Sequence, residues 1–366
     1  GDLLHEEIDS DKVNWEKSGK PLLCQRPLAD PNNVEKLVLA LKKAERPIIV
    51  SGSGVIWSQA SNEMTQFVEN LGIPFYTTPQ GRGVLPDDHK LSWPTMRSTA
   101  FREADLVIVV GTRMNYISGH ISTPRFNKEL VIARIDIDPE DVSSSARHVD
   151  IGLIGDCKSI FEQLIKASDG KISSSNYSNW RQHLESGSAE KRQRPGTNQP
   201  PKGDPIHPLE LCDAVKSFMN RDAILVVDGQ EILNYGRQWI PTFSPGHRLN
   251  SGPFGTMGVG LPFGLGAKLA KPEKQVIVIH GDGSLGLNVM ELDTAVRHNI
   301  PVLVVVSLNG GWTGDPDQTK AGRDLGYTQY HKIAEALGCY SEYVENPDEI
   351  LPALKRAQEK VDSGSV

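Results

Sequence analysis

An aspartate and an asparagine in the second half of the chain have the types and the spacing of metal ligands. Asp282 stands between Gly281 and Gly283 after the mostly apolar segment 275–279, and Asn309 follows the mostly apolar segment 302–307. Carboxylate and amide oxygens suit Mg²⁺, which usually shares its protein ligands with phosphate groups. The pattern therefore predicts a magnesium ion and a phosphorylated ligand at these two turns.

The third ligand would be the free backbone carbonyl of Gly311, two residues after Asn309. The N–H groups of Gly283 and Ser284 begin a helical pattern, and the start of a helix can bind the diphosphate that shares the metal. A lone Gly-Asp-Gly is more often a simple turn, which Asn309 would then cap. The strand context and the single intervening helix favour the metal site over the turn.

One helix between two apolar strands must bring these turns together. The residues Leu285, Val289, Leu292 and Val296 repeat at helical spacing between the two strands. Consecutive strands joined by a right-handed crossover are adjacent or nearly so, and ligands bind at the carboxyl ends of such strands. We therefore expect Asp282 and Asn309 to lie close together.

Alternating strand and helix patterns predict an α/β protein with two doubly wound parallel sheets. One domain is expected at 26–169 and the other at 206–366, with a linker at 170–205 that is rich in Ser, Pro and Gly. Residues 1–25 are expected to be a linker from a preceding domain, because the chain starts without a Met or a signal peptide. Strands are expected at 47–50, 74–76, 104–111, 131–139, 223–227, 275–279 and 302–307, and helices at 60–70, 208–219, 252–270 and 285–297.

Composition excludes several classes of function. The 39 basic and 46 acidic residues give a formal charge of −7, which argues against nucleic-acid binding and against binding to a membrane surface. The longest uncharged apolar runs have about ten residues, too few to span a bilayer. The cysteines are far apart and indicate neither a zinc site nor a disulfide framework, so a reducing cytoplasm is the expected location, with the peroxisome as an alternative that no visible signal supports. The four cysteines are Cys24, Cys157, Cys212 and Cys339.

The spacing of the two turns resembles a known family. Gly281-Asp282-Gly283-Ser284, with Asn309 27 positions after the aspartate, resembles the thiamin diphosphate motif of the acetolactate synthase/pyruvate decarboxylase superfamily. The segment Gly255-Thr256-Met257-Gly258-Val259-Gly260-Leu261-Pro262 resembles one that the carboligase branch carries at the same distance before the aspartate. Residues 26–167 resemble the family's middle domain, and residues from 206 onward resemble its diphosphate-binding domain.

The resemblance implies thiamin diphosphate and Mg²⁺ as cofactors and assigns roles to single residues. Asp282, Asn309 and the Gly311 carbonyl would hold the metal, although Leu308 stands where the family commonly has a first Asn. The catalytic roles fall to Met257, which would bend the cofactor between its rings, and to the Gly255 carbonyl, which would accept a hydrogen bond from the aminopyrimidine. Further cofactor contacts are expected from Asp228, Gly229, Gln230, Glu231, Gly281, Gly283 and Ser284.

Segments of the middle domain are similar to oxalyl-CoA decarboxylase and 2-hydroxyacyl-CoA lyase, namely 111–116 and 135–139. In that branch the middle domain can hold an adenine nucleotide, and in the acetolactate synthases it can hold FAD, so ADP or FAD is implied with Arg113 and Asp136 as contacts. The alternative is a strand-end arginine and an aspartate in a helix cap. Trp312 and Thr313 stand where the decarboxylases carry Ile-Tyr, which favours the lyase or the carboligase.

The implied function is a thiamin-diphosphate- and Mg²⁺-dependent C–C lyase, decarboxylase or carboligase. Its substrate would be a 2-oxo acid or a 2-hydroxyacyl-CoA, and the full-length enzyme would be a homodimer or a homotetramer. The activating glutamate would lie on a pyrimidine-binding domain absent from this chain, so residues 1–366 alone should not turn over and should expose an apolar patch. The alternative is a non-catalytic nucleotide-binding or assembly fragment.

Overall fold

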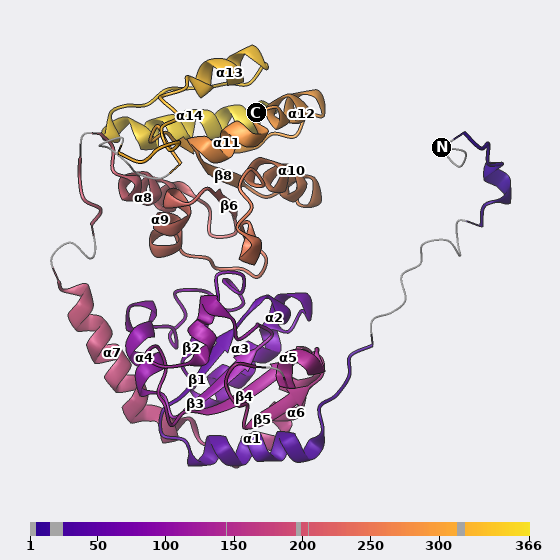
Figure 1. The fold of residues 1–366 in the computed structure, drawn as a ribbon, viewed down its shortest axis with the longest axis vertical. Helices are drawn as coiled ribbons and strands as arrows, with labels where there is room; N and C mark the ends of the chain where they lie inside the picture. The colour runs from indigo at the N-terminus through magenta and orange to yellow at the C-terminus, as the bar shows by residue number, and fades with distance from the viewer. Residues whose placement is uncertain (1–4, 15–24, 144, 195–198, 204, 313–318) are drawn as a thin grey trace.

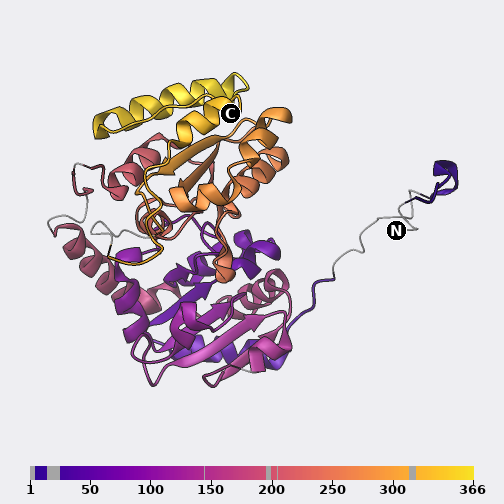
Figure 2. The ribbon, with the colours of Figure 1, turned by 45° about the horizontal axis from the view of Figure 1, so that its top comes forward.

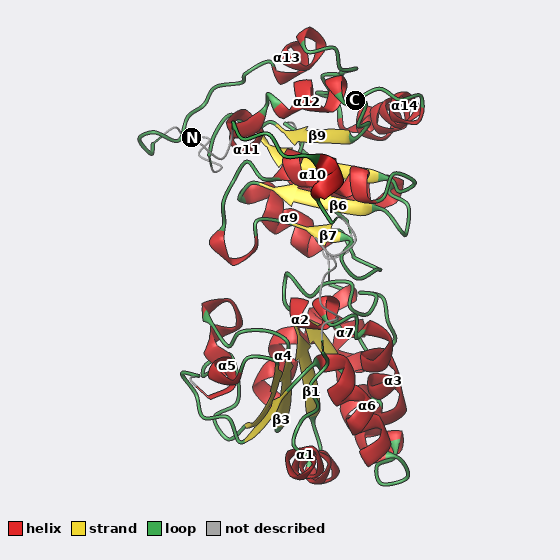
Figure 3. Ribbon diagram, turned by 90° about the vertical axis from the view of Figure 1, so that its right-hand side faces the viewer, coloured by secondary structure: helices red, strands yellow, loops and turns green. Residues whose placement is uncertain are grey.

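The computed structural model describes residues 5–14, 25–143, 145–194, 199–203, 205–312 and 319–366. Most of the linker expected at 1–25, Cys24 included, lies outside the described residues, and so does Thr313. The described part forms two α/β domains, drawn one above the other in Figures 1 and 3. A short 3₁₀ helix at Ser10–Lys12 lies away from both of them (Figures 1 and 2).

The first domain contains a five-stranded parallel sheet, in the order β2-β1-β3-β4-β5. Its strands β1 and β3 are buried at every position because helices cover both faces of the sheet, and the parallel sheet confirms the predicted fold class. The strands are β1 (Pro47–Ser51), β2 (Phe75–Thr77), β3 (Leu106–Val110), β4 (Val131–Asp136) and β5 (Ile151–Ile154). The helices are α1 (Pro31–Lys43), α2 (Ser53–Trp57), α3 (Ser61–Leu71), α4 (Arg97–Glu103), α5 (Pro139–Ser143), α6 (Cys157–Ser168) and α7 (Ser178–Arg192).

The segment 170–205, predicted to be a linker, carries helix α7 instead. Trp180, Leu184 and Ser188 repeat at helical spacing and are buried, and the indole N–H of Trp180 donates to the carbonyl of Pro47, 3.2 Å away. The polar composition of this segment obscured a narrow apolar stripe, so the first domain extends to the end of α7.

The second domain contains a four-stranded parallel sheet, in the order β7-β6-β8-β9. The predicted helix at 252–270 begins only at residue 260, and the predicted helix at 285–297 is divided in two. The strands are β6 (Ile224–Asp228), β7 (Arg248–Leu249), β8 (Val276–Gly281) and β9 (Leu303–Ser307). The helices are α8 (Pro208–Phe218), α9 (Glu231–Trp239), α10 (Gly260–Ala270), α11 (Asp282–Asn288), α12 (Glu291–Arg297), α13 (Tyr330–Ala336) and α14 (Ile350–Asp362).

The two domains meet through the turn that follows β2. Arg82 of this turn donates to the backbone carbonyls of Arg237 and Ile240, at 3.0 and 3.1 Å. Asp87 accepts from the N–H of Thr242 at 2.8 Å. Within the described ranges, none of the helices is both long and apolar enough to cross a membrane.

Candidate cofactor site

The second sheet changes direction between β6 and β8, because the chain adds β7 on one side of β6 and then returns to place β8 on the other. Ligands bind at such switch points, beyond the carboxyl ends of the strands. A small hollow lies there. It is lined by the turns after β6, β8 and β9 and by Met257. The lining residues are Gly229, Gln230, Glu231, Ile232, Met257, Gly281, Asp282, Gly283, Ser284, Ser307, Asn309, Gly311 and Trp312.

Asp282 is the first residue of α11 and is 2% exposed. One carboxylate oxygen accepts from the N–H of Gly283 at 2.8 Å, and the other accepts from the N–H of Gly310 at 2.7 Å. The second bond joins the turn after β8 to the turn after β9, as expected for adjacent parallel strands. Burial raises the pKa of Asp282, while the N–H groups that it accepts from lower it.

Asn309 follows β9, and both the nitrogen and the oxygen of its side-chain amide form hydrogen bonds. Its nitrogen donates to a carboxylate oxygen of Glu231 at 2.6 Å, and its oxygen accepts from the N–H of Gly311 at 3.1 Å. Gly311 faces Asp324 in an isolated antiparallel bridge. The hydrogen bonds of that bridge use residues 310, 312, 323 and 325, so the Gly311 carbonyl takes no part in them.

Asp228, expected along the diphosphate, has a carboxylate that accepts from backbone N–H groups. Its side chain is buried and is not part of the lining of the hollow. One oxygen accepts from the N–H of Gly229 at 2.7 Å, and the other accepts from the N–H groups of Gly258 and Gly260, both at 2.8 Å. The carboxylate therefore ties the end of β6 to the turn that carries Met257.

The neighbouring turn after β6 requires a glycine. Gly229 has a φ of +118°, and a Cβ atom there would lie 3.2 Å from the backbone nitrogen of Gly281. The turns after β6 and β8 thus approach each other backbone to backbone. This approach brings Gln230 and Glu231, in the turn after β6, close to Asp282, in the turn after β8.

A buried histidine precedes the aspartate and was not predicted to take part in the site. His280 is fully buried; its Nδ1 lies 3.0 Å from the hydroxyl of Ser284 and 3.8 Å from a carboxylate oxygen of Asp228. Burial lowers its pKa to about 4, so the imidazole is neutral near pH 7. Because the Ser284 hydroxyl donates to the Gly281 carbonyl at 2.9 Å, the imidazole nitrogen Nδ1 is the donor to Ser284.

Of two other predicted residues, Gly283 lines the hollow and Gly255 does not. A Cβ atom on Gly283 would lie 2.8 Å from the ring of Trp312, so this indole packs directly on the Gly-Asp-Gly turn. Gly255 has a φ of +67° and ends a short 3₁₀ helix, and it is not among the lining residues. The structure therefore brings Met257, but not Gly255, to the hollow.

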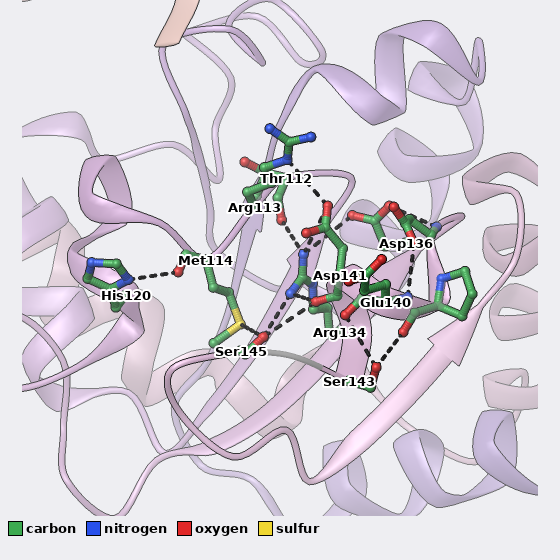
Figure 4. Close-up of polar contacts among 12 residues, drawn as sticks. Thr112, Arg113, Met114, His120, Arg134, Asp136, Glu140, Asp141, Ser143 and Ser145 are labelled. Atoms are coloured by element: carbon green, nitrogen blue, oxygen red, sulfur yellow. Dashed lines mark hydrogen bonds and ion pairs between the residues drawn. The ribbon is translucent and has the colours of Figure 1, made fainter. Parts of the chain in front are cut away.

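The nucleotide contacts proposed for the first domain lie around a residue that the sequence analysis missed (Figure 4). Arg134, inside β4, has a side chain 2% exposed and donates to the backbone carbonyl of Asp141 and, at 2.8 Å, to the hydroxyl of Ser145. Asp136 lies 3.8 Å from the guanidinium of Arg134, and Arg113 lies 3.4 Å from a carboxylate oxygen of Asp141. A single arginine inside an apolar strand was the sequence signal for this cluster.

Large apolar side chains are exposed in the segments that flank the hollow. Phe254 is 93% exposed and precedes the Met257 turn, and Leu287 and Met290 are 53% and 61% exposed in and after α11. Whether they form the surface on which a further domain packs stays a prediction.

The fold and the hollow define a class of protein with two parallel-sheet domains and an oxygen-rich site at one switch point. Comparison with known families places the chain within that class. Residues 34–164 match the central domain of thiamine pyrophosphate enzymes, and residues 233–365 match their C-terminal TPP binding domain. The chain belongs to the thiamine pyrophosphate enzyme family.

Curated relatives carry several different activities in their names. The chain is 32% identical to a 2-hydroxyacyl-CoA lyase of Arabidopsis thaliana over 88% of its own length and 59% of the relative's. It is 33% identical to the acetolactate synthase large subunit IlvG of Mycobacterium tuberculosis over 87% and 58%, and 30% identical to an oxalyl-CoA decarboxylase of Escherichia coli over 88% and 58%. The chain thus spans about three fifths of the length of these relatives.

Proposed function

We propose that this chain holds thiamin diphosphate and Mg²⁺ at the switch point of its second sheet, and that it works as a C–C lyase, decarboxylase or carboligase. The observation that carries the proposal is the meeting of Asp282, Asn309 and Gly311 with Met257 in one hollow. Across the described residues, no group of three His, Cys, Asp or Glu side chains could hold a metal. A metal here would therefore use amide and carbonyl oxygens beside the Asp282 carboxylate and would share phosphate oxygens, which suits Mg²⁺.

The chemical types of the three oxygen ligands and their meeting in one hollow both suit Mg²⁺. Asp282 would supply a carboxylate oxygen, Asn309 an amide oxygen and Gly311 a carbonyl oxygen that its bridge leaves free. Bound thiamin diphosphate supplies a nucleophilic carbon and an electron sink for breaking or forming a bond beside a carbonyl group. The chain's own part is to anchor the diphosphate through the turns after β6 and β8, and to support the two rings on Met257.

The substrate that we propose is a 2-oxo acid or a 2-hydroxyacyl-CoA, in line with the relatives' names. Trp312, packed on Gly283, favours the lyase or the carboligase over the decarboxylase of oxalyl-CoA. We place the activating glutamate on a pyrimidine-binding domain outside residues 1–366, docked on the apolar side chains beside the hollow in a homodimer or homotetramer. An adenine nucleotide or FAD would bind beside Arg113 and Asp136, at the carboxyl end of β4.

Calorimetry with thiamin diphosphate, with and without Mg²⁺, tests the cofactor assignment. The wild-type chain should bind the cofactor much more tightly with Mg²⁺, and Asp282→Ala should lose this difference because it removes the one carboxylate among the three ligands. Asp222→Ala, at an exposed aspartate paired with Lys274, is the matched control and should behave as wild type. Unchanged affinity in Asp282→Ala would refute the metal assignment, and a chain that bound only ADP would favour the non-catalytic alternative.

A further inference from the structure

Glu231 makes a contact with a proposed metal ligand that the sequence analysis did not predict. It begins α9 directly after the turn that follows β6, while Asn309 follows β9, and β8 lies between these strands. The carboxylate of Glu231 accepts from the amide nitrogen of Asn309 at 2.6 Å. Both side chains are partly buried and both line the hollow.

This contact decides which end of the Asn309 amide faces the hollow. A carboxylate accepts hydrogen bonds but cannot donate them, so it selects the NH₂ group of the amide. The oxygen is then held on the other side, where it accepts from the N–H of Gly311 at 3.1 Å and keeps a second lone pair. Within the amide, only the oxygen can bind a cation. An Asn309 side chain rotated by 180° would present its NH₂ group to the cation instead.

The second consequence of Glu231 is electrostatic. Glu231 and Asp282 are the charged residues among the described residues that line the hollow, and both are acidic. A diphosphate that entered without a cation would meet two carboxylates and no Lys or Arg from that lining. A divalent cation reverses this balance, because it attracts both carboxylates and the phosphate oxygens.

We propose that Glu231 is a positioning residue for the cation site: it orients the Asn309 oxygen toward the cation and makes diphosphate binding conditional on the cation being bound first. The inference rests on the proposed function, since it concerns the same site. Partners that orient metal ligands typically contribute 10–100-fold to metal affinity.

The test measures Mn²⁺ binding to the whole chain by electron paramagnetic resonance, without thiamin diphosphate. Wild-type chain should bind Mn²⁺. Glu231→Gln keeps an acceptor for Asn309 but loses the charge, and should weaken Mn²⁺ binding by up to about tenfold; Glu231→Ala loses both and should weaken it by about 10–100-fold. Glu359→Gln, at an exposed position on α14, is the matched control and should match wild type.

Thiamin diphosphate titrations of the same variants distinguish positioning from damage to the fold. In the presence of EDTA, Glu231→Gln should bind the cofactor more tightly than wild type, because one repulsive charge is gone; with Mg²⁺ the order should reverse. A variant that was merely destabilised would bind more weakly under both conditions and would overturn the proposal.

Two further outcomes separate this inference from the proposed function. If wild-type chain binds thiamin diphosphate with Mg²⁺ but the Glu231 variants match it in every titration, or if Mn²⁺ binds only after the cofactor, the inference fails while the function stands. If wild-type chain binds no thiamin diphosphate even with Mg²⁺, the proposed function itself fails.

Discussion

The buried carboxylate of Asp228 should control the rigidity of the turn that carries Met257. Its two oxygens accept from three backbone N–H groups, two of which belong to Gly258 and Gly260. Asn288 adds a bond of 2.7 Å to the carbonyl of Gly258. The substitution Asp228→Asn keeps the size of the side chain and replaces one acceptor oxygen by a donor.

The expected cost follows from the number of donors that lose their acceptor. Asparagine has one amide oxygen, so either orientation of the amide leaves at least one of the three N–H groups facing an NH₂ group. A hydrogen bond to a charged group contributes about 1.5–3 kcal/mol. We therefore expect local opening of the turn to become about 2 kcal/mol easier, which corresponds to roughly a 30-fold change in the opening equilibrium.

Hydrogen exchange measures this opening directly, followed by mass spectrometry on a peptide that covers residues 255–262. Protection of that peptide should fall by roughly 30-fold in Asp228→Asn, while the peptides of the first domain should keep their protection. Asp222→Asn, at an aspartate on the surface of the same domain, should leave both unchanged. Equal protection of the 255–262 peptide in Asp228→Asn and in wild type would refute the anchoring role of Asp228.

Two more predictions concern protons. The pKa of His280 falls to about 4 in the folded chain against an ordinary value of 6.5, so the contribution of its neutral form to stability is complete above pH 6.5 and is lost as the pH falls toward 4. The free energy of unfolding in urea should therefore be about 2 kcal/mol lower at pH 5 than at pH 7. An equal pH dependence in His280→Gln would contradict the role of His280. The chain alone should exchange the C2 hydrogen of thiamin diphosphate slowly when followed by NMR, because the proposed activating glutamate lies outside residues 1–366; fast exchange would mean that a residue of this chain activates the cofactor.

Local pattern was sufficient for the parallel sheets and for the pair of turns. The strands expected at 275–279 and 302–307 contain the continuous apolar runs 276–279 and 302–306, and such runs are typical of strands covered on both faces. A right-handed crossover places β8 and β9 side by side. The proximity of Asp282 and Asn309 could therefore be predicted without coordinates. The expected helix between them was divided, because periodicity alone does not reveal a local break at 289–290.

Segments with mixed composition were predicted less well. Helix α7 was expected to be part of a linker, because its apolar stripe is only one residue wide in each turn and polar residues dominate the composition of the segment. Its stability comes from packing against the first domain, where Trp180 reaches the carbonyl of Pro47. Tertiary contacts of this kind determine most helical stability in proteins.

By itself, the sequence determined the class of fold, the family resemblance and the two turns that meet at the end of the second sheet, since all of these depend on residue type and on spacing along the chain. Only the tertiary structure decided what each side chain faces. It placed the Asp228 carboxylate against the N–H groups of the Met257 turn, and it placed Glu231 against Asn309, 78 residues away. Motif spacing cannot resolve such contacts, because the direction of a side chain at a turn depends on which backbone N–H groups and side chains other strands bring within hydrogen-bonding distance.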